Sequence, residues 1–286
     1  MQHLKIFIEL TRLNKPIGFM LLFWPCSWGL AYAYLKNQNL NLFLYYMVLF
    51  FLGSVLMRSA GCIFNDIVDK DFDKKVKRTK IRPIAAGKIS VNQSFLYVCI
   101  LCLLAFFILI QFNNLTIILG LASMVLAFSY PFMKRITYWP QLFLGITFNW
   151  GAVMAYSAFE QAITIEVLIL YLAAIFWTLG YDTIYGAQDM SDDEIIGLKS
   201  TAIKFKKEIK LFVAVSYTIA ILMTLYLFKD YIGFNISALL LLMFLLSLYY
   251  QLIAFKKHQP DTCLRMFKFN NFTGLILFLS ILSINI

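Results

Sequence analysis

The chain has 286 residues, of which 61% are hydrophobic and only 14% are charged, and its mean hydropathy is +0.77. Soluble globular domains are usually about a quarter charged, so this composition excludes an ordinary soluble enzyme and indicates a lipid bilayer as solvent. The net charge of +10 would suggest nucleic acid as a partner of a soluble protein, but membrane proteins gather basic residues in the loops of one side. We therefore expect one polytopic membrane domain over residues 1–286 and no nucleic-acid partner.

The first 15 residues form a short, mildly amphipathic segment. Neither a cleavage site of small residues nor an Arg- and Ser-rich transit sequence is recognisable, which favours a bacterial inner membrane. Nine apolar runs follow, each long enough to cross a hydrocarbon core of about 30 Å as a helix. They predict an all-α integral membrane protein with spans at 17–35, 42–64, 94–112, 115–133, 141–159, 163–184, 209–228, 234–254 and 266–285.

The basic residues predict the orientation of these spans. If the N-terminus is cytoplasmic, all but three of the 25 Lys and Arg residues fall in or beside cytoplasmic segments. Lys36 and Lys229 fall in outer loops, and Arg58 lies within the second span. A missed or additional span in the middle of the chain would destroy this separation, so we expect nine spans with the N-terminus inside.

An acidic cluster follows the second apolar run. On a helix, Asn65, Asp69 and Asp73 are spaced by four residues and share a face, with Asp66 beside them. Asp71 lies two positions from both neighbouring aspartates and points elsewhere.

A second acidic cluster follows the sixth run. Asp182, Tyr185, Asp189 and Asp193 share a helical face, and Asp192 lies at its edge. In the predicted topology both clusters are cytoplasmic. Carboxylates crowded at a membrane boundary repel one another and lose hydration, so a cation is expected to hold them together.

All-oxygen ligands of this kind suit Mg²⁺ or Ca²⁺ better than zinc or copper. Mg²⁺ typically takes one or two carboxylates and completes its shell with waters and phosphate oxygens, so the clusters imply a phosphorylated ligand. Of the five cysteines, Cys99 and Cys102 have the spacing of a redox or zinc pair, but they lie inside an apolar run with no second pair nearby and are interpreted as packing residues. His3 and His258 are isolated, which argues against a histidine metal site.

Basic side chains near the clusters could grip a diphosphate. Most of them follow the first cluster, and Lys134 and Arg135 end the fourth span close to Tyr130. Arg58 is costly to keep in lipid and is therefore expected to face a polar cavity, two helical turns before Asn65 and on the same face. The first group comprises Lys74, Lys75, Lys77, Arg78, Lys80, Arg82 and Lys88.

These motifs resemble the UbiA family of intramembrane prenyltransferases. Asn65-Asp66-x-x-Asp69-x-x-x-Asp73 with the segment Lys77 to Pro83 is similar to its first signature, and Tyr181 to Asp193 followed by Ile196 to Thr201 is similar to its second. Further segments resemble its 4-hydroxybenzoate polyprenyltransferase branch: Arg12 to Gly18 with Trp24-Pro25, Met57 to Cys62, and Tyr130 to Arg135. Asn14 departs from the pattern, where an acidic residue is expected in many relatives.

The resemblance implies nine helices around a central cavity that opens toward lipid, with a cytoplasmic active site. It implies transfer of a polyprenyl group from polyprenyl diphosphate to the ring carbon ortho to the hydroxyl of 4-hydroxybenzoate, in ubiquinone biosynthesis, with Mg²⁺ as cofactor. Arg135 matches a basic residue implicated in activity, and we rank it before Arg58 as the ligand of the benzoate carboxylate.

The predicted site residues fall into three groups. Metal ligands are predicted at Asn65, Asp66, Asp69, Asp73, Asp189 and Asp193. Catalytic roles are predicted for Asp69, Asp73, Asp189 and Arg135. Substrate binding is predicted for Arg58, Lys77, Arg78, Arg82, Tyr130, Lys134, Tyr185 and Lys199.

Three other interpretations compete with this one. A prenyltransferase of the haem, menaquinone or chlorophyll type would use the same machinery on another acceptor. A cation-coupled transporter would place its charges near the middle of broken helices, whereas these lie at helix ends. A CDP-alcohol phosphotransferase would need a glycine where Lys70 stands.

Overall fold

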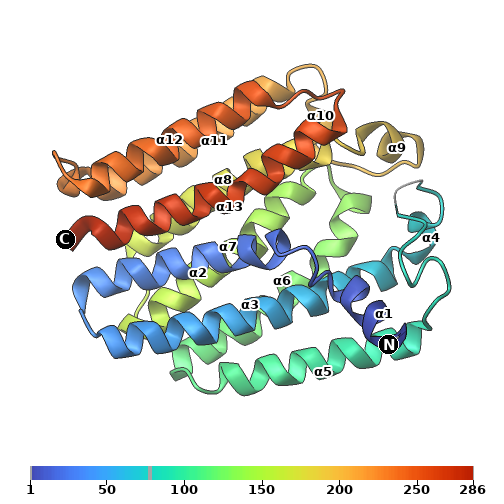
Figure 1. The fold of residues 1–286 in the computed structure, drawn as a ribbon, viewed down its shortest axis with the longest axis horizontal. Coiled ribbons are helices and arrows are strands. Elements are labelled where there is room, and N and C mark those ends of the chain that lie inside the picture. Colours follow the sequence, from blue (N-terminus) through green and yellow to red (C-terminus); the bar gives the residue numbers. More distant parts are fainter. Residues whose placement is uncertain (1, 77–78, 286) are drawn as a thin grey trace.

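The computed structural model describes residues 2–76 and 79–285, and within them all regular structure is helical (Figure 1). The long helices are α2 (Ile17–Lys36), α3 (Leu40–Val68), α5 (Val91–Leu109), α6 (Asn114–Ile136), α7 (Pro140–Glu160), α8 (Ile165–Gly186), α11 (Ile209–Phe228), α12 (Ile236–Ala254) and α13 (Pro260–Leu282). The short ones are α1 (Gln2–Thr11), α4 (Lys70–Asp73), α9 (Met190–Ile195), α10 (Thr201–Lys204), and two 3₁₀ turns at Lys229–Tyr231 and Ser283–Asn285.

Each predicted apolar run corresponds to one long helix, and eight of these helices are long and apolar enough to cross a membrane among the residues described. The ninth, α13, has 23 residues, but its first half carries Asp261, Arg265 and Lys268. The all-helical membrane fold is therefore confirmed, but of the nine predicted spans the described residues support eight.

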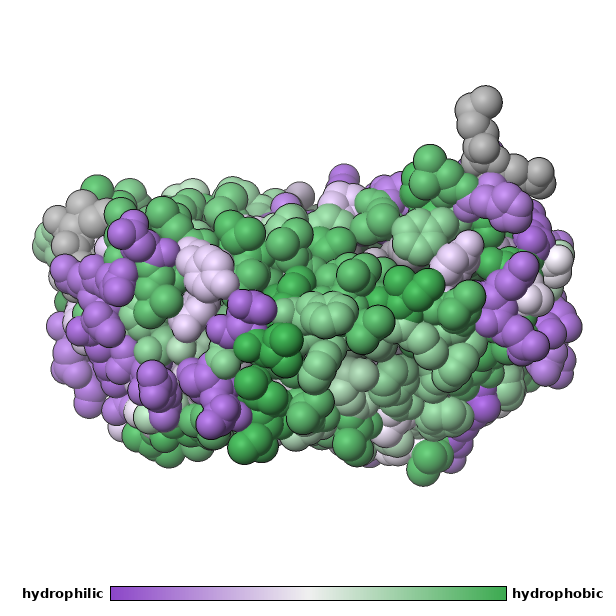
Figure 2. Space-filling model, turned by 90° about the horizontal axis from the view of Figure 1, so that it is seen from below, coloured by the Kyte–Doolittle hydropathy of each residue, from purple (hydrophilic) through white to green (hydrophobic). Residues whose placement is uncertain are grey.

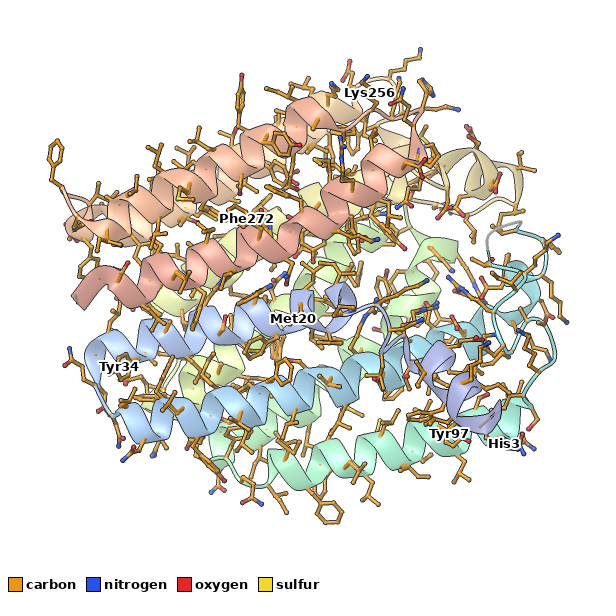
Figure 3. The ribbon with its side chains drawn as sticks, viewed as in Figure 1. His3, Met20, Tyr34, Tyr97, Lys256 and Phe272 are labelled. Carbon is orange, nitrogen blue, oxygen red and sulfur yellow. The ribbon has the colours of Figure 1, made fainter. Side chains whose placement is uncertain are left out.

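The surface of the molecule matches a bilayer. Figure 2 shows a broad hydrophobic band between two hydrophilic ends. The short helices α4, α9 and α10 lie at one end of the bundle in Figure 1, and Figure 3 places His3 and Lys256 at that end and Tyr34 at the other. The chain is therefore a multi-pass membrane protein whose two acidic clusters lie at the same end.

Helices α2 and α8 are the most buried of the candidate membrane spans, and α13 packs against both. The rings of Trp28 and Trp177 pack with centroids 4.9 Å apart, and the Trp177 indole nitrogen donates to the Asn270 side chain at 2.9 Å, so this polar atom of the apolar core is paired. At Gly29 on α2, a Cβ would lie 2.2 Å from the Ala152 carbonyl oxygen on α7. Only glycine permits this approach of the two helices.

The packing is looser on the other side of the bundle. Helix α5 packs against α3, and α6 packs against α7, whereas α5 and α6 make little contact with each other. This arrangement leaves space between the two helix pairs, and the principal cavity of the described structure occupies it.

Candidate active site

A cavity of about 1220 Å³ runs from the end that carries the short helices into the bundle. Both acidic clusters line its mouth, through Asp66, Asp69 and Asp73 on one side and Asp189 and Asp193 on the other. Its deeper part is lined mainly by apolar residues of α3, α5, α6 and α7, among them Phe50, Phe106, Leu109, Met124 and Met154. A polar mouth on an apolar limb suits a ligand with a charged head and a hydrocarbon tail.

The first cluster keeps its predicted helical spacing even though the helix is interrupted. Helix α3 ends at Val68, and α4 begins at Lys70. Across this break the Asp69 amide donates to the Asn65 carbonyl at 2.9 Å, and the Asp73 amide donates to the Asp69 carbonyl at 2.8 Å. Because these bonds preserve the four-residue repeat, the three side chains still face the cavity, as predicted.

Asp71 points away, which confirms the expectation from its spacing. Its side chain is 84% exposed and pairs only with the neighbouring Lys74 among the contacts that the structure describes, at 3.2 Å. Asp192 is likewise exposed and does not line the cavity. Both residues therefore serve as internal comparisons for their cavity-facing neighbours.

Basic side chains hold the buried carboxylates of the first cluster. Asp66 accepts from Arg12 at 2.6 Å and from Arg82 at 3.1 Å, and Arg82 also donates to Asp73 at 2.8 Å. Asp69, which is completely buried, pairs with Lys134 and with Arg135 at 3.2 Å. Burial raises the pKa of the Asp73 carboxyl above its ordinary value, and the charge of Arg82 opposes that rise.

Arg12, for which the sequence predicts no role, is a partner of the first acidic cluster. It adopts a left-handed backbone conformation with φ of 55°, which is uncommon outside glycine, and this turn between α1 and α2 directs its guanidinium to Asp66. The sequence offers one indication of this role: Arg12 lies three residues before Lys15, next to the start of the first span.

The second cluster is built in the same manner as the first. Helix α8 ends at Gly186, and Asp189 occupies the N-cap position of α9. The Asp193 amide donates to the Asp189 carbonyl at 2.8 Å, so both carboxylates belong to one helical turn that borders the cavity. Tyr185 also lines the cavity and packs on Phe267, with ring centroids 4.2 Å apart.

The described carboxylates do not converge on one point: no group of three or more acidic, His or Cys side chains among them could hold a metal ion. The predicted all-oxygen cage is therefore not formed in this conformation. The physical reason is that Asp66, Asp69 and Asp73 are drawn onto Arg12, Arg82 and Lys134. The donor set still fits Mg²⁺, which needs only one or two carboxylates when phosphate oxygens complete its shell.

Several predicted substrate-binding residues line the cavity, namely Arg58, Arg82, Tyr130, Lys134, Tyr185 and Lys199. Lys77 and Arg78 lie outside the described residues. Lys199 also donates to the Ile136 carbonyl at 3.2 Å, which ties the chain after α9 to the end of α6.

Arg135 is not among the residues that line the cavity. Its guanidinium donates to the Val68 carbonyl at 2.8 Å and to Asp69, and it lies over the Phe72 ring at 4.7 Å. These contacts hold the end of α3. The structure therefore places Arg58, and not Arg135, at the cavity wall, and the ranking of the two as carboxylate ligands stays a prediction.

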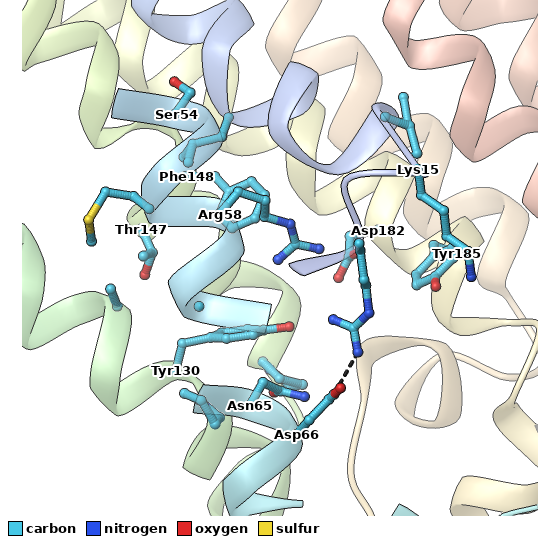
Figure 4. Close-up of a pocket in the computed structure, with 18 of the residues that line it drawn as sticks. Lys15, Ser54, Arg58, Asn65, Asp66, Tyr130, Thr147, Phe148, Asp182 and Tyr185 are labelled. Atoms are coloured by element: carbon cyan, nitrogen blue, oxygen red, sulfur yellow. Dashed lines mark hydrogen bonds and ion pairs between the residues drawn. The ribbon is translucent and has the colours of Figure 1, made fainter. Parts of the chain in front are cut away.

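Arg58 borders both the main cavity and a smaller chamber of about 140 Å³. Its guanidinium lies over the Phe148 ring at 5.2 Å, and its buried Nε has no hydrogen-bond partner in the described structure. Asp182 and Tyr130 line the same chamber (Figure 4). The Nε of Arg135 is also without a partner, but Arg58 is the one of the two that lines the cavity. A half-buried cation at a cavity wall with unused hydrogen-bonding capacity is a ready ligand for a carboxylate.

The model of the UbiA prenyltransferase family matches residues 22–279. The chain belongs to the UbiA prenyltransferase family. The resemblance inferred from the two acidic motifs is thus confirmed over most of the chain and extends through the last three long helices.

Relatives of this UbiA-family chain carry names from one branch. It is 43% identical over 284 residues to the mitochondrial 4-hydroxybenzoate polyprenyltransferase of Bos taurus, which covers 97% of this chain and 75% of the relative. It is 38% identical over 282 residues to the 4-hydroxybenzoate octaprenyltransferase of Coxiella burnetii, with coverage of 98% and 96%.

Solved structures share the fold of this UbiA-family chain. An apo UbiA homologue from Aeropyrum pernix has a TM-score of 0.76 at 23% identity, covering 92% of this chain and 96% of its own. A UbiA homologue from Archaeoglobus fulgidus bound to GPP and Mg²⁺ has a TM-score of 0.71 at 17% identity, with coverage of 97% and 99%.

Proposed function

We propose that this enzyme transfers a polyprenyl group from polyprenyl diphosphate to the ring carbon ortho to the hydroxyl of 4-hydroxybenzoate, a step of ubiquinone biosynthesis. The observation that carries the proposal is one cavity that joins two carboxylate clusters, several cations and a long apolar limb. The relatives named for 4-hydroxybenzoate at 38% and 43% identity favour this acceptor over those of the other branches.

The diphosphate of the donor belongs at the mouth of the cavity. When bound, Mg²⁺ would be held there by Asn65, Asp69, Asp189 and Asp193, and it would neutralise the diphosphate as the allylic bond ionises. Arg82 and Lys134 line the same mouth. With a metal held at these residues, Lys134 would exchange Asp69 for outer phosphate oxygens, and Arg82 would bind them through N–H groups not engaged by Asp66 and Asp73, so that both cations stabilise the charge of the leaving group.

The smaller chamber suits the aromatic acid. A cavity of about 150 Å³ in another protein accommodates benzene, and the chamber of about 140 Å³ is of that size. In this proposal Arg58 binds the benzoate carboxylate and Phe148 contacts the chamber beside it. The ring would thereby be fixed against the first carbon of the prenyl chain.

The reaction breaks one bond of the donor, forms one carbon–carbon bond and releases one proton. The allylic carbon–oxygen bond breaks with its electron pair on diphosphate, and the ring carbon ortho to the hydroxyl forms the new carbon–carbon bond. The ring then loses its proton to a carboxylate. Asp182 is the carboxylate that lines both the chamber and the main cavity, so we assign the proton to it.

An assay with membranes that contain the protein tests this function. Geranyl diphosphate and 4-hydroxybenzoate are expected to give the prenylated acid in the presence of Mg²⁺ and none after chelation of divalent metal. Homogentisate and a dihydroxynaphthoate serve as competing acceptors in the same membranes. Preference for either of them would overturn the assignment of the acceptor, and transfer without divalent metal would overturn the assignment of the metal.

The proposed setting is the inner membrane of a bacterium with the N-terminus and the active site in the cytoplasm. Most basic residues lie near the end of the helix bundle that carries the acidic clusters, as Lys256 does (Figure 3). The positive-inside rule favours the cytoplasm for that end. The exposed residues Gln38 and Lys88 lie in loops between α2 and α3 and between α4 and α5, which this topology assigns to opposite sides.

Cysteine labelling provides the test of this topology. In a variant without the five native cysteines, Gln38→Cys is expected to react with a membrane-impermeant maleimide on intact spheroplasts. Lys88→Cys is expected to react only after lysis. The reverse pattern, or labelling of both positions before lysis, would contradict the proposed orientation.

A further inference from the structure

Two glycines of α3 stand out because nothing in the fold requires them. Gly53 and Gly61 lie inside the helix, where glycine destabilises the backbone relative to alanine. A Cβ at either position would meet no heavy atom within 4 Å. Neither residue therefore permits a close helix contact, in contrast to Gly29, and neither has a positive φ.

Both glycines line the main cavity, and so does Met57 between them. They are separated by eight residues, which is about 12 Å along a helix, and Gly53 lies about 18 Å from Asn65 on the same scale. The cavity-facing side of α3 that begins at the acidic cluster therefore has no side chain at Gly61 and none at Gly53. The space that their missing side chains leave belongs to the ligand cavity.

The apolar limb ends shortly beyond Gly53. One turn further along α3, the ring of Phe50 packs against Phe112 with centroids 4.8 Å apart, and both residues are buried. Phe106 of α5 and Leu121 of α6 also line the cavity and are 43% and 51% exposed. Leu109 of α5 packs against Gly120 of α6, where a Cβ would lie 2.5 Å from the Leu109 Cδ1, but the two helices make little other contact. A tail that passes Gly53 therefore has its way out into lipid beside this contact.

We propose that Gly53 determines which prenyl chains the enzyme accepts, by keeping the limb wide at the level that only longer chains reach. This inference rests on the proposed function. An isoprene unit adds four carbon–carbon bonds of about 1.5 Å, or roughly 5 Å of extended chain. A geranyl group of two units therefore stops short of Gly53, whereas a chain of eight units passes it.

The test compares kcat/KM for geranyl and octaprenyl diphosphate in three full-length variants. Gly53→Phe is expected to lower the value for the octaprenyl donor by about tenfold or more, because the ring fills the limb. Geranyl transfer by the same variant is expected to stay within about twofold of the wild type, which also shows that the variant folds. Gly53→Ala leaves both donors unchanged, since its Cβ meets open space.

Leu52→Phe is the matched control on the same turn of α3, because Leu52 is 45% exposed and does not line the cavity. It is expected to alter neither donor. An equal loss of both donors in an accumulating Gly53→Phe protein, or no loss of either, overturns the inference.

If Gly53→Phe does not accumulate, Gly53→Leu is assayed in its place with the same criteria. Geranyl and octaprenyl thiolodiphosphate, which are not hydrolysed, are then tested as inhibitors. The Gly53 variant must be inhibited less than the wild type by the octaprenyl compound and equally by the geranyl compound. A wild type that prenylates 4-hydroxybenzoate with neither donor would instead refute the proposed function.

Discussion

Exchange of Asp69 for asparagine is expected to lower kcat by about 10²- to 10³-fold, because one buried ligand of the metal and its diphosphate is lost. Asp69 is completely buried at the mouth of the cavity, where Lys134 and Arg135 hold it. The change keeps the shape of the side chain, so the protein should still insert and accumulate. The measurement is single-turnover transfer in membranes that contain equal amounts of each variant.

Asp71→Asn provides the matched control, only two residues away. Its side chain is 84% exposed and pairs with Lys74, so activity should stay within about twofold of the wild type. Comparable losses in both variants would mean that the cluster acts through its overall charge. Full activity of Asp69→Asn at limiting Mg²⁺ would contradict a metal-ligand role of this carboxylate.

Exchange of Arg58 for methionine is expected to raise KM for 4-hydroxybenzoate by about 30-fold or more, since a buried carboxylate would lose its cation. Arg58 borders the small chamber and keeps an unpartnered Nε in the described structure. KM for the prenyl diphosphate should change little. The measurement is initial-rate kinetics with each substrate varied in turn, and with 4-hydroxybenzaldehyde as an acceptor that lacks the carboxylate.

Arg135→Gln distinguishes the two candidate arginines. Because Arg135 holds Asp69 and the end of α3 and does not line the cavity, its loss should lower kcat and leave KM for the aromatic acid unchanged. A raised KM for the acid in Arg135→Gln, with a normal value in Arg58→Met, would support the ranking that the sequence suggested.

Much of the fold follows from hydropathy. Nine apolar runs became nine long helices, because a segment in lipid must satisfy its backbone hydrogen bonds internally. The least apolar of them is α13, whose first half carries Asp261 and Lys268. Hydropathy alone could not show that α5 and α6 separate around the cavity, since lipid-facing and cavity-facing apolar residues have the same composition.

Helical spacing predicted the cavity-facing carboxylates well. It separated Asp69 and Asp73 from Asp71, and the hydrogen bonds across the break between α3 and α4 explain why a simple helical period sufficed. It could not predict which cation each carboxylate meets. Arg12 reaches Asp66 from 54 positions away through a left-handed turn, and Arg135 turns toward Asp69 because the end of α6 lies beside the end of α3.

The central claim is that two acidic clusters on opposite sides of one mouth jointly hold a metal–diphosphate. The most direct measurement is calorimetric binding of geranyl thiolodiphosphate to the purified protein in lipid nanodiscs, with and without Mg²⁺, for the wild type, Asp69→Asn and Asp189→Asn. We predict tight binding by the wild type only with Mg²⁺, and its loss in both variants. Metal-independent binding, or unchanged binding by Asp189→Asn, would contradict the claim.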